Sequence, residues 1–156
     1  MTDQVILPMV DVTNRLVSPA AGRQATADVN RQLKHLSLYN FEGLTTMRAI
    51  ITCAKKFAIA QSNMDLARVA CALERYRLAQ GGYPESLEVL APQYIDKLPH
   101  DIINGQPLNY RRTDGGNYIV YSVGWNEKDD GGVVVLNKNG VVDRDKGDWV
   151  WDSNAK

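Results

Sequence analysis

A long amphipathic helix with a clearly marked end dominates this sequence. Between Asp65 and Pro84 the chain reads DLARVACALERYRLAQGGYP. Apolar residues recur there at steps of three and four, which is the spacing of one helix face: Leu66, Val69, Leu73 and Tyr76. The pair Gly81-Gly82 supplies the left-handed residue that commonly ends a helix, and Pro84 cannot continue one. Such a helix needs a second layer to cover its apolar face.

The helical pattern begins well before this stretch. The Thr45-Thr46 pair offers an N-cap, and apolar residues continue at helical spacing through residues 47–58. We therefore expect one helix over about residues 44–80, with the Ser62-Asn63 pair as a place where it would kink. Its first half cannot cover its own apolar face, so it is expected to pack against the N-terminal segment or against a partner.

Residues 1–42 differ from the rest and are expected to form a weakly helical N-terminal extension. Val5 to Leu7 have the composition of a short edge strand, and residues 20–38 show weak helical periodicity. The predicted organisation is this extension followed by one domain over residues 43–156.

The C-terminal part of the chain has the pattern of a small antiparallel sheet. After a short helix at residues 85–90, the predicted strands at 108–113 and 117–123 flank the turn Asp114-Gly115-Gly116. A second hairpin is predicted over residues 133–142, around the turn NKNG, and a closing strand over 148–151. The sheet thus spans about residues 108–151, and the fold class is α+β: a long helix packed on a small antiparallel sheet.

Charge and cysteine content exclude several classes of function. The chain carries 18 Lys plus Arg and 18 Asp plus Glu, so no net field favours nucleic acid. No run reaches the roughly 18 apolar residues of a membrane-spanning helix, and no secretory signal is expected after Met1.

Cys53 and Cys71 lie roughly 27 Å apart along the predicted helix, too far for a mutual disulfide. We expect both to be buried as small apolar groups.

The strongest chemical signal is a concentration of carboxylates between Asn126 and Asp148. Calcium takes roughly six to eight oxygen ligands, and Gly131-Gly132 allow a tight turn that aims several of them inward. The hairpin returns the segment DRDKGD beside the segment DDGG. Two interpretations stay open: a shared calcium ion, or a solvated loop whose carboxylates pair with neighbouring lysines and arginines.

Several motifs follow the long helix in a fixed order. They are a YP turn, Leu98-Pro99-His100-Asp101, the run NGQPLNY at residues 104–110, a hairpin ending in YSVG, and the acidic glycine-rich loop. This order resembles the globular domain of type II secretion major pseudopilins (G-type), over residues 65–151. It is also similar to a domain at the C-terminus of uncharacterised bacterial envelope-anchored proteins. In the pseudopilins a long helix packs on a three-stranded antiparallel sheet, and the loop after the YSxG-like strand closes around calcium.

The resemblance implies a site, a location and partners. Carried onto this chain, the calcium ligands are drawn from Asp129, Asp130, Asp143, Asp145 and Asp148. The implied location is extracytoplasmic, in the periplasm or at the cell surface, with a membrane anchor only outside this chain. The implied partners are proteins of the cell envelope, including a second copy bound through the long helix, and not nucleic acid.

The sequence therefore favours a non-enzymatic structural or interaction module of the bacterial cell envelope. The alternative is an extracytoplasmic module that binds carbohydrate or peptide through the loop aspartates and Trp125, Trp149 and Trp151, although core packing is the ordinary role of such tryptophans. An enzyme would need two loop aspartates as an acid–base pair in a cleft. Asp101 is interpreted as the first residue of an Asx turn.

Overall fold

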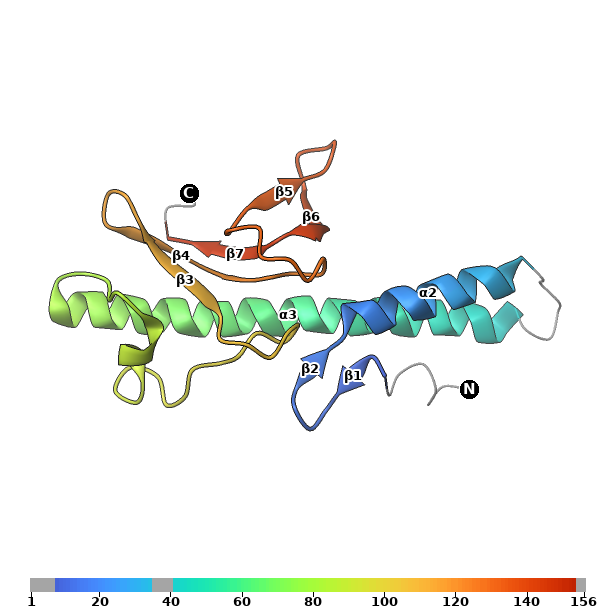
Figure 1. The fold of residues 1–156 in the computed structure, drawn as a ribbon, viewed down its shortest axis with the longest axis horizontal. Coiled ribbons are helices and arrows are strands. Elements are labelled where there is room, and N and C mark those ends of the chain that lie inside the picture. The colour runs from blue at the N-terminus through green and yellow to red at the C-terminus, as the bar shows by residue number, and fades with distance from the viewer. Residues whose placement is uncertain (1–7, 35–40, 154–156) are drawn as a thin grey trace. The chain divides into compact units, whose positions relative to one another are not determined.

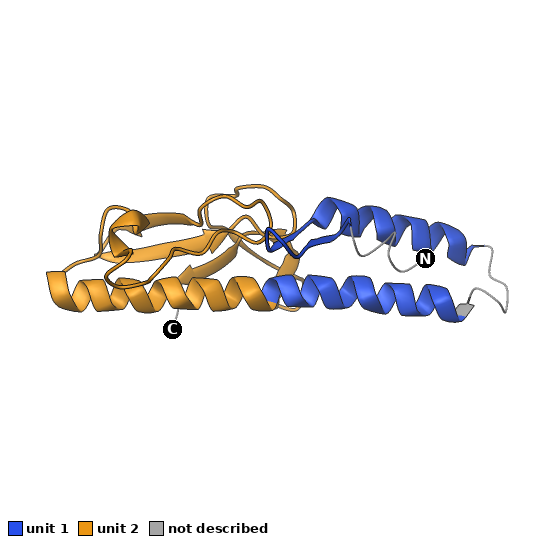
Figure 2. Cartoon of the chain, turned by 90° about the horizontal axis from the view of Figure 1, so that it is seen from below, with its two compact units in different colours: residues 1–59 blue, residues 60–156 orange. Residues whose placement is uncertain are grey.

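The predicted fold class is confirmed: the chain is α+β, with a long helix packing on small antiparallel sheets (Figure 1). The structure is a computed structural model, and the residues it describes are 8–34 and 41–153. They belong to two compact units, Met1–Ile59 and Ala60–Lys156, which Figure 2 colours separately. The sequence-based boundary between residues 42 and 43 stays a prediction.

The first unit contains a short hairpin and a helix. Strands β1 (Val10–Asp11) and β2 (Leu16–Val17) pair antiparallel. Helix α2 (Pro19–Leu33) follows Ser18, whose Oγ accepts a hydrogen bond of 3.2 Å from the backbone N–H of Ala21. The weak helical periodicity of residues 20–38 is thus confirmed as far as residue 33. The edge strand predicted at residues 5–7 lies outside the described residues.

Helix α3 (Phe41–Gln80) is the long predicted helix, and it begins earlier than expected. The hydroxyls of Thr45 and Thr46 both donate to the carbonyl of Glu42 at 2.9 Å. They lie inside the helix, so the predicted N-cap at this pair is wrong. The helix continues without interruption through residues 62 and 63, where a kink was expected. None of the helices in the described part of the chain is long and apolar enough to cross a membrane.

The end of α3 is where the sequence predicts it. Gly81 has φ of 81°, in the left-handed region, and its N–H donates to the carbonyl of Arg77 at 2.8 Å. This conformation favours glycine because a Cβ is disfavoured at positive φ.

The second unit is built on a three-stranded antiparallel sheet. Its strands are β3 (Asn109–Thr113), β4 (Asn117–Ser122) and β7 (Trp149–Asp152), in the order β3-β4-β7. The predicted hairpin turn is present, with Gly115 and Gly116 at φ of 85° and 78°. Strands β5 (Val134–Leu136) and β6 (Val142–Gly147) form a separate two-stranded sheet.

The core of this unit joins the C-terminal half of α3 to the sheet. Leu66, Val69 and Leu73 of α3 are at most 1% exposed, as is Val120 of β4. The predicted helix at 85–90 is a single 3₁₀ turn, η1 (Leu87–Leu90), and its two leucines join the same cluster. The remaining members of the cluster are Ala70, Ala72, Tyr94, Leu108 and Tyr118.

The tryptophans divide between core and surface. Trp149 and Trp125 are 1% and 7% exposed, which confirms core packing for these two, whereas Trp151 is 41% exposed.

The prediction that both cysteines are buried is wrong, because Cys53 and Cys71 are exposed. Cys71 lies two residues from Val69, which places it about 200° further around the helix, away from the buried face.

We predict that Leu73→Ala lowers the free energy of unfolding by about 2–5 kcal/mol, because it leaves a cavity between α3 and the sheet. Leu78→Ala on the same helix is the matched control, since Leu78 is 76% exposed, and its effect should stay within about 0.5 kcal/mol. Urea unfolding of the two variants measures both values. Similar losses in the two variants would contradict the assignment of the buried face.

Candidate functional site

The acidic loop lies between β4 and β5, and Asp148 connects it to the start of β7. The carboxylate of Asp148 is 1% exposed. Its Oδ1 accepts from the backbone N–H of Asp130 at 3.3 Å, and its Oδ2 accepts from that of Gly132 at 2.7 Å. The expected approach of the segment DDGG to the segment DRDKGD is therefore present, and the backbone N–H of Asp148 adds a hydrogen bond of 2.9 Å to the carbonyl of Val133.

Asp129 and Asp130 belong to the same loop but have different partners. Asp129 Oδ1 accepts from the hydroxyl of Tyr121 at 3.0 Å and from the N–H of Gly131 at 2.9 Å. Burial, followed by the hydrogen bond to Asp129, raises the pKa of Tyr121 to about 12. Asp130 Oδ2 accepts from the side-chain amide of Asn126 at 2.7 Å.

Two glycines let this loop approach the strands closely. At Gly132, which has φ of 81°, a Cβ would lie 2.5 Å from Cδ1 of Ile119. At Gly147, which has φ of 65°, a Cβ would lie 2.5 Å from the carbonyl oxygen of Val133. Both positions need glycine for conformation and for space, so the loop is held against β4 and β5 by backbone shape as well as by Asp148.

Asp143 and Asp145 lie on β6 with local partners. Asp143 Oδ1 accepts from the N–H of Asp145 at 3.1 Å, and its Oδ2 lies 3.4 Å from Nζ of Lys146. Of the five predicted ligands, the structure gathers Asp129, Asp130 and Asp148 at one loop. Within residues 8–34 and 41–153, no three His, Cys, Asp or Glu side chains form a group already arranged to hold a metal ion.

The electrostatics of the loop centre on Asp148. Burial raises the pKa of Asp148 above its usual value, and the neighbouring charges of Asp130 and Asp129 raise it further. The N–H groups of Gly132 and Asp130 act in the opposite direction. A buried carboxylate beside two others is a place where a cation would lower the free energy of the charged state.

Asp101 is a second buried carboxylate, and it does more than the sequence suggested. The predicted Asx turn is confirmed, since Oδ1 accepts from the N–H of Ile103 at 2.9 Å. The same oxygen accepts from the hydroxyl of Ser122, and Oδ2 accepts from the N–H of Val123, both at 2.9 Å. Asp101 therefore fastens the turn at residues 101–107 to the end of β4. Only its position in a DxxNG turn signalled a structural role, and the contact with β4 had no signal in the sequence.

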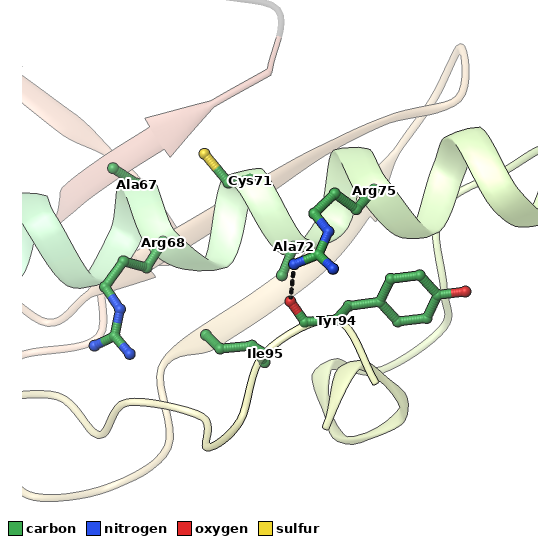
Figure 3. Close-up of a pocket in the computed structure, with 7 residues that line it drawn as sticks. All are labelled: Ala67, Arg68, Cys71, Ala72, Arg75, Tyr94 and Ile95. Carbon is green, nitrogen blue, oxygen red and sulfur yellow. Dashed lines mark hydrogen bonds between the residues drawn. The ribbon is translucent and has the colours of Figure 1, made fainter. Parts of the chain in front are cut away.

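Two shallow pockets flank α3 in the second unit. One has a volume of about 310 Å³ and is crossed by the hydrogen bond from Arg75 to the carbonyl of Tyr94, at 2.8 Å (Figure 3). The other, about 760 Å³, lies beside β7 and includes Glu74 and the exposed Trp151. Their residues are Ala67, Arg68, Cys71, Ala72, Arg75, Tyr94 and Ile95 for the first, and Ala70, Cys71, Glu74, Arg75, Tyr118, Val150, Trp151, Asp152 and Ser153 for the second.

Comparison with known proteins gives no relative on which to base a function. The chain matches no protein-family model, no curated protein and no solved structure. The candidate site is therefore described by its own geometry, and the pseudopilin resemblance stays a prediction.

We predict that Asp148 makes the stability of the protein depend on pH in an unusual direction. Its pKa in the folded state is raised above the value of 3.8, so the folded state binds more protons than the unfolded state just above that pH. Its contribution to stability is therefore present at low pH and is lost as the pH rises through the folded-state pKa. In Asp148→Asn this contribution is absent.

Urea unfolding in EDTA between pH 3.5 and 7, buffered in steps of about half a unit, compares the two proteins across that window. The stability advantage of the natural protein over Asp148→Asn should shrink as the pH rises. An advantage that grows with pH would contradict a raised pKa.

We also predict that Asp101→Ala lowers the free energy of unfolding by about 3 kcal/mol or more, because three buried donors lose their acceptor. Asn104→Ala is the matched control in the same turn. Asn104 Oδ1 accepts a hydrogen bond from the N–H of Gln106 at 2.9 Å, at an exposed position, so its loss should cost about 1 kcal/mol. Equal losses would show that Asp101 does not fasten the turn to β4.

Proposed function

We propose that this chain is a non-enzymatic structural or interaction module of the bacterial cell envelope, extracytoplasmic and similar to a secretion pseudopilin, whose acidic loop is stiffened by calcium. The observation that carries the proposal is that the buried carboxylate of Asp148 accepts hydrogen bonds from the backbone of the loop that bears Asp129 and Asp130, near enough for the charges of those two residues to act on it. Asp129 and Asp130 come from the segment after β4, and Asp148 precedes β7. The helix and the sheet form the rigid part that presents this loop.

The donor chemistry of the loop suits calcium. Carboxylate and carbonyl oxygens are the ligands that calcium takes, and its coordination tolerates irregular loops. Asp129, Asp130 and Asp148 would hold the ion, with backbone carbonyls of the glycine-rich turn as further donors. Burial and then the like charges of Asp130 and Asp129 raise the pKa of Asp148, and a divalent cation would offset these charges. Asp143 and Asp145 would act indirectly, by shaping β6 next to the loop.

The tryptophans do not favour the carbohydrate-binding alternative. A sugar platform needs exposed rings, and two of the three candidates, Trp125 and Trp149, are buried. Trp149 also donates its ring N–H to the carbonyl of Arg144 at 3.2 Å, as a core tryptophan commonly does. These rings stabilise the domain, which supports a structural role for the sheet.

We predict that millimolar calcium raises the thermal midpoint of the natural chain over that in EDTA, because an ion that binds only the folded state stabilises it by mass action. At about 100 times the dissociation constant the gain is about 2.7 kcal/mol, or roughly 5–10 °C for a domain of this size. Asp130→Ala should lose most of this shift.

Asp114→Ala is the matched control, because it removes the same charge from an exposed position in the β3–β4 turn. It should keep the full calcium shift. Magnesium at the same concentration separates a specific ion from general screening. The natural chain is first chelated exhaustively and then given calcium. If its thermal midpoint is then no higher than in EDTA, the calcium part of the proposal is overturned.

A further inference from the structure

Strand β7 is the outer strand of the three-stranded sheet. The strand order is β3-β4-β7, so within residues 8–34 and 41–153 one edge of β7 pairs with β4 and the opposite edge pairs with no strand. The larger of the two pockets, about 760 Å³, has β7 as one wall and α3 as the other, and we call it the β7 groove. All of its residues belong to the second compact unit: Ala70, Cys71, Glu74 and Arg75 of α3, Tyr118 of β4, Val150, Trp151 and Asp152 of β7, and Ser153.

The backbone of β7 directs hydrogen-bonding groups to this open edge. In an antiparallel pair, successive residues direct their N–H and C=O groups alternately to the neighbouring strand and away from it. The N–H of Ser153 donates to the carbonyl of Tyr118 at 3.2 Å, in register with the pairs of β4 and β7. Ser153 and Trp151 therefore direct their backbone groups to β4. Val150 and Asp152, which alternate with them, direct theirs to the open edge, where they match the backbone of a further extended chain.

The two edges of the sheet differ in their side chains. The β3 edge carries Arg111 and Arg112, which are both exposed, and Arg112 forms an ion pair with Glu85. Charged side chains are a usual protection of an edge strand. The β7 edge instead carries Trp151, which is 41% exposed. Because Trp151 lies opposite Val120 of the core cluster, its ring is on the α3 side of the sheet, where it lines the β7 groove.

The α3 wall and the charges of the groove indicate which side chains would fit. Ala70 and Cys71 are small, so they leave room for a large apolar side chain beside the tryptophan ring. The acidic residues of the groove are Glu74 and Asp152. Its basic residue, Arg75, donates its hydrogen bond into the smaller pocket (Figure 3). The charge that remains at the groove is therefore complementary to a basic partner.

We infer that the β7 groove binds an extended peptide segment of another protein, which adds to β7 as a fourth strand of the sheet. The peptide alternates apolar with basic residues. Its apolar side chains lie on the same face as Trp151 and enter the groove, and its basic side chains lie on the face of Asp152. The inference rests on the proposed role as an interaction module and gives the chemistry of a partner, but it does not depend on calcium.

The length of β7 limits the strength of this contact. Its four residues span about 13 Å at the rise of an extended chain, which is enough to pair with about five residues of peptide. Such a contact is smaller than the roughly 800 Å² that each partner buries in a stable complex. We therefore expect weak, reversible binding, which is best observed residue by residue.

The test titrates a defined probe into the full-length chain, labelled with ¹⁵N, in the presence of EDTA. The probe is a capped pentapeptide in which three leucines alternate with two lysines. Saturable chemical-shift changes are expected at the amides of Val150 and Asp152. The same two amides should exchange with solvent at least tenfold more slowly once the probe is bound, because they then donate to its backbone.

N-methylation of the probe separates strand addition from side-chain attraction. The lysines of the probe lie opposite Val150 and Asp152, so their N–H groups face β7, and the N–H groups of the leucines face solvent. N-methylation of both lysines should weaken binding at least tenfold, because two hydrogen bonds are lost. N-methylation of two leucines is the matched control and should leave the affinity within about twofold of the unmodified probe.

A pair of variants on α3 tests the groove itself. Cys71→Phe fills the space beside Trp151 and should weaken binding of the probe at least tenfold. Leu78→Phe is the matched control, since Leu78 is 76% exposed on the same helix and does not line the groove. It should leave the affinity unchanged. Circular dichroism confirms that both variants fold.

Each of the following results overturns the inference. The probe fails to saturate the chain at millimolar concentration, or the two N-methylated probes bind equally well. Shifts confined to residues 126–132 would show that the lysines are attracted to the acidic loop alone. A chain that forms dimers in sedimentation, with the amide of Val150 already protected before the probe is added, would show that a second copy occupies the edge. Because the titration is made in EDTA, its failure is distinct from the failure of the calcium proposal.

Discussion

The burial of one face of α3 beneath the sheet is the constraint on which the second unit depends. Leu66, Val69 and Leu73 are almost fully excluded from solvent, and they contact residues from η1, β4 and the loops between them. Because burial of apolar surface is the main favourable term in folding, this contact fixes which face of the sheet is inward. The remaining parts of the unit, including the acidic loop, are held relative to this core.

Two buried carboxylates hold loops in place by accepting hydrogen bonds from backbone and hydroxyl groups. Asp101 fastens the 101–107 turn to the end of β4, and Asp148 holds the 130–132 segment through two backbone N–H groups. A carboxylate that accepts several hydrogen bonds from backbone groups can replace the regular pairing that a loop lacks. The loop is thereby given a defined shape, which is what an interaction surface or an ion site requires.

Much of the fold was predictable because it depends on local patterns. The glycine stop at Gly81, the β3–β4 hairpin and the helical stripe each follow from residues close together in sequence. The start of α3 was missed because Thr45 and Thr46 bond back to Glu42 within the helix, which competes with capping. The exposure of Cys71 and the contacts of Asp101 were missed because they depend on tertiary packing. For the candidate site, the meeting of DDGG with Asp148 was foreseen, while the separate placement of Asp143 and Asp145 on β6 was not.

The buried carboxylates of Asp101 and Asp148 make these loops part of the folded core. Native-state hydrogen exchange of the amides of Ile103, Val123 and Gly132 tests it most directly, since each donates to Asp101 or Asp148. The account predicts that these amides exchange about as slowly as those of β4, through global unfolding. Exchange at the rate of an unprotected loop, while β4 remains protected, would contradict it.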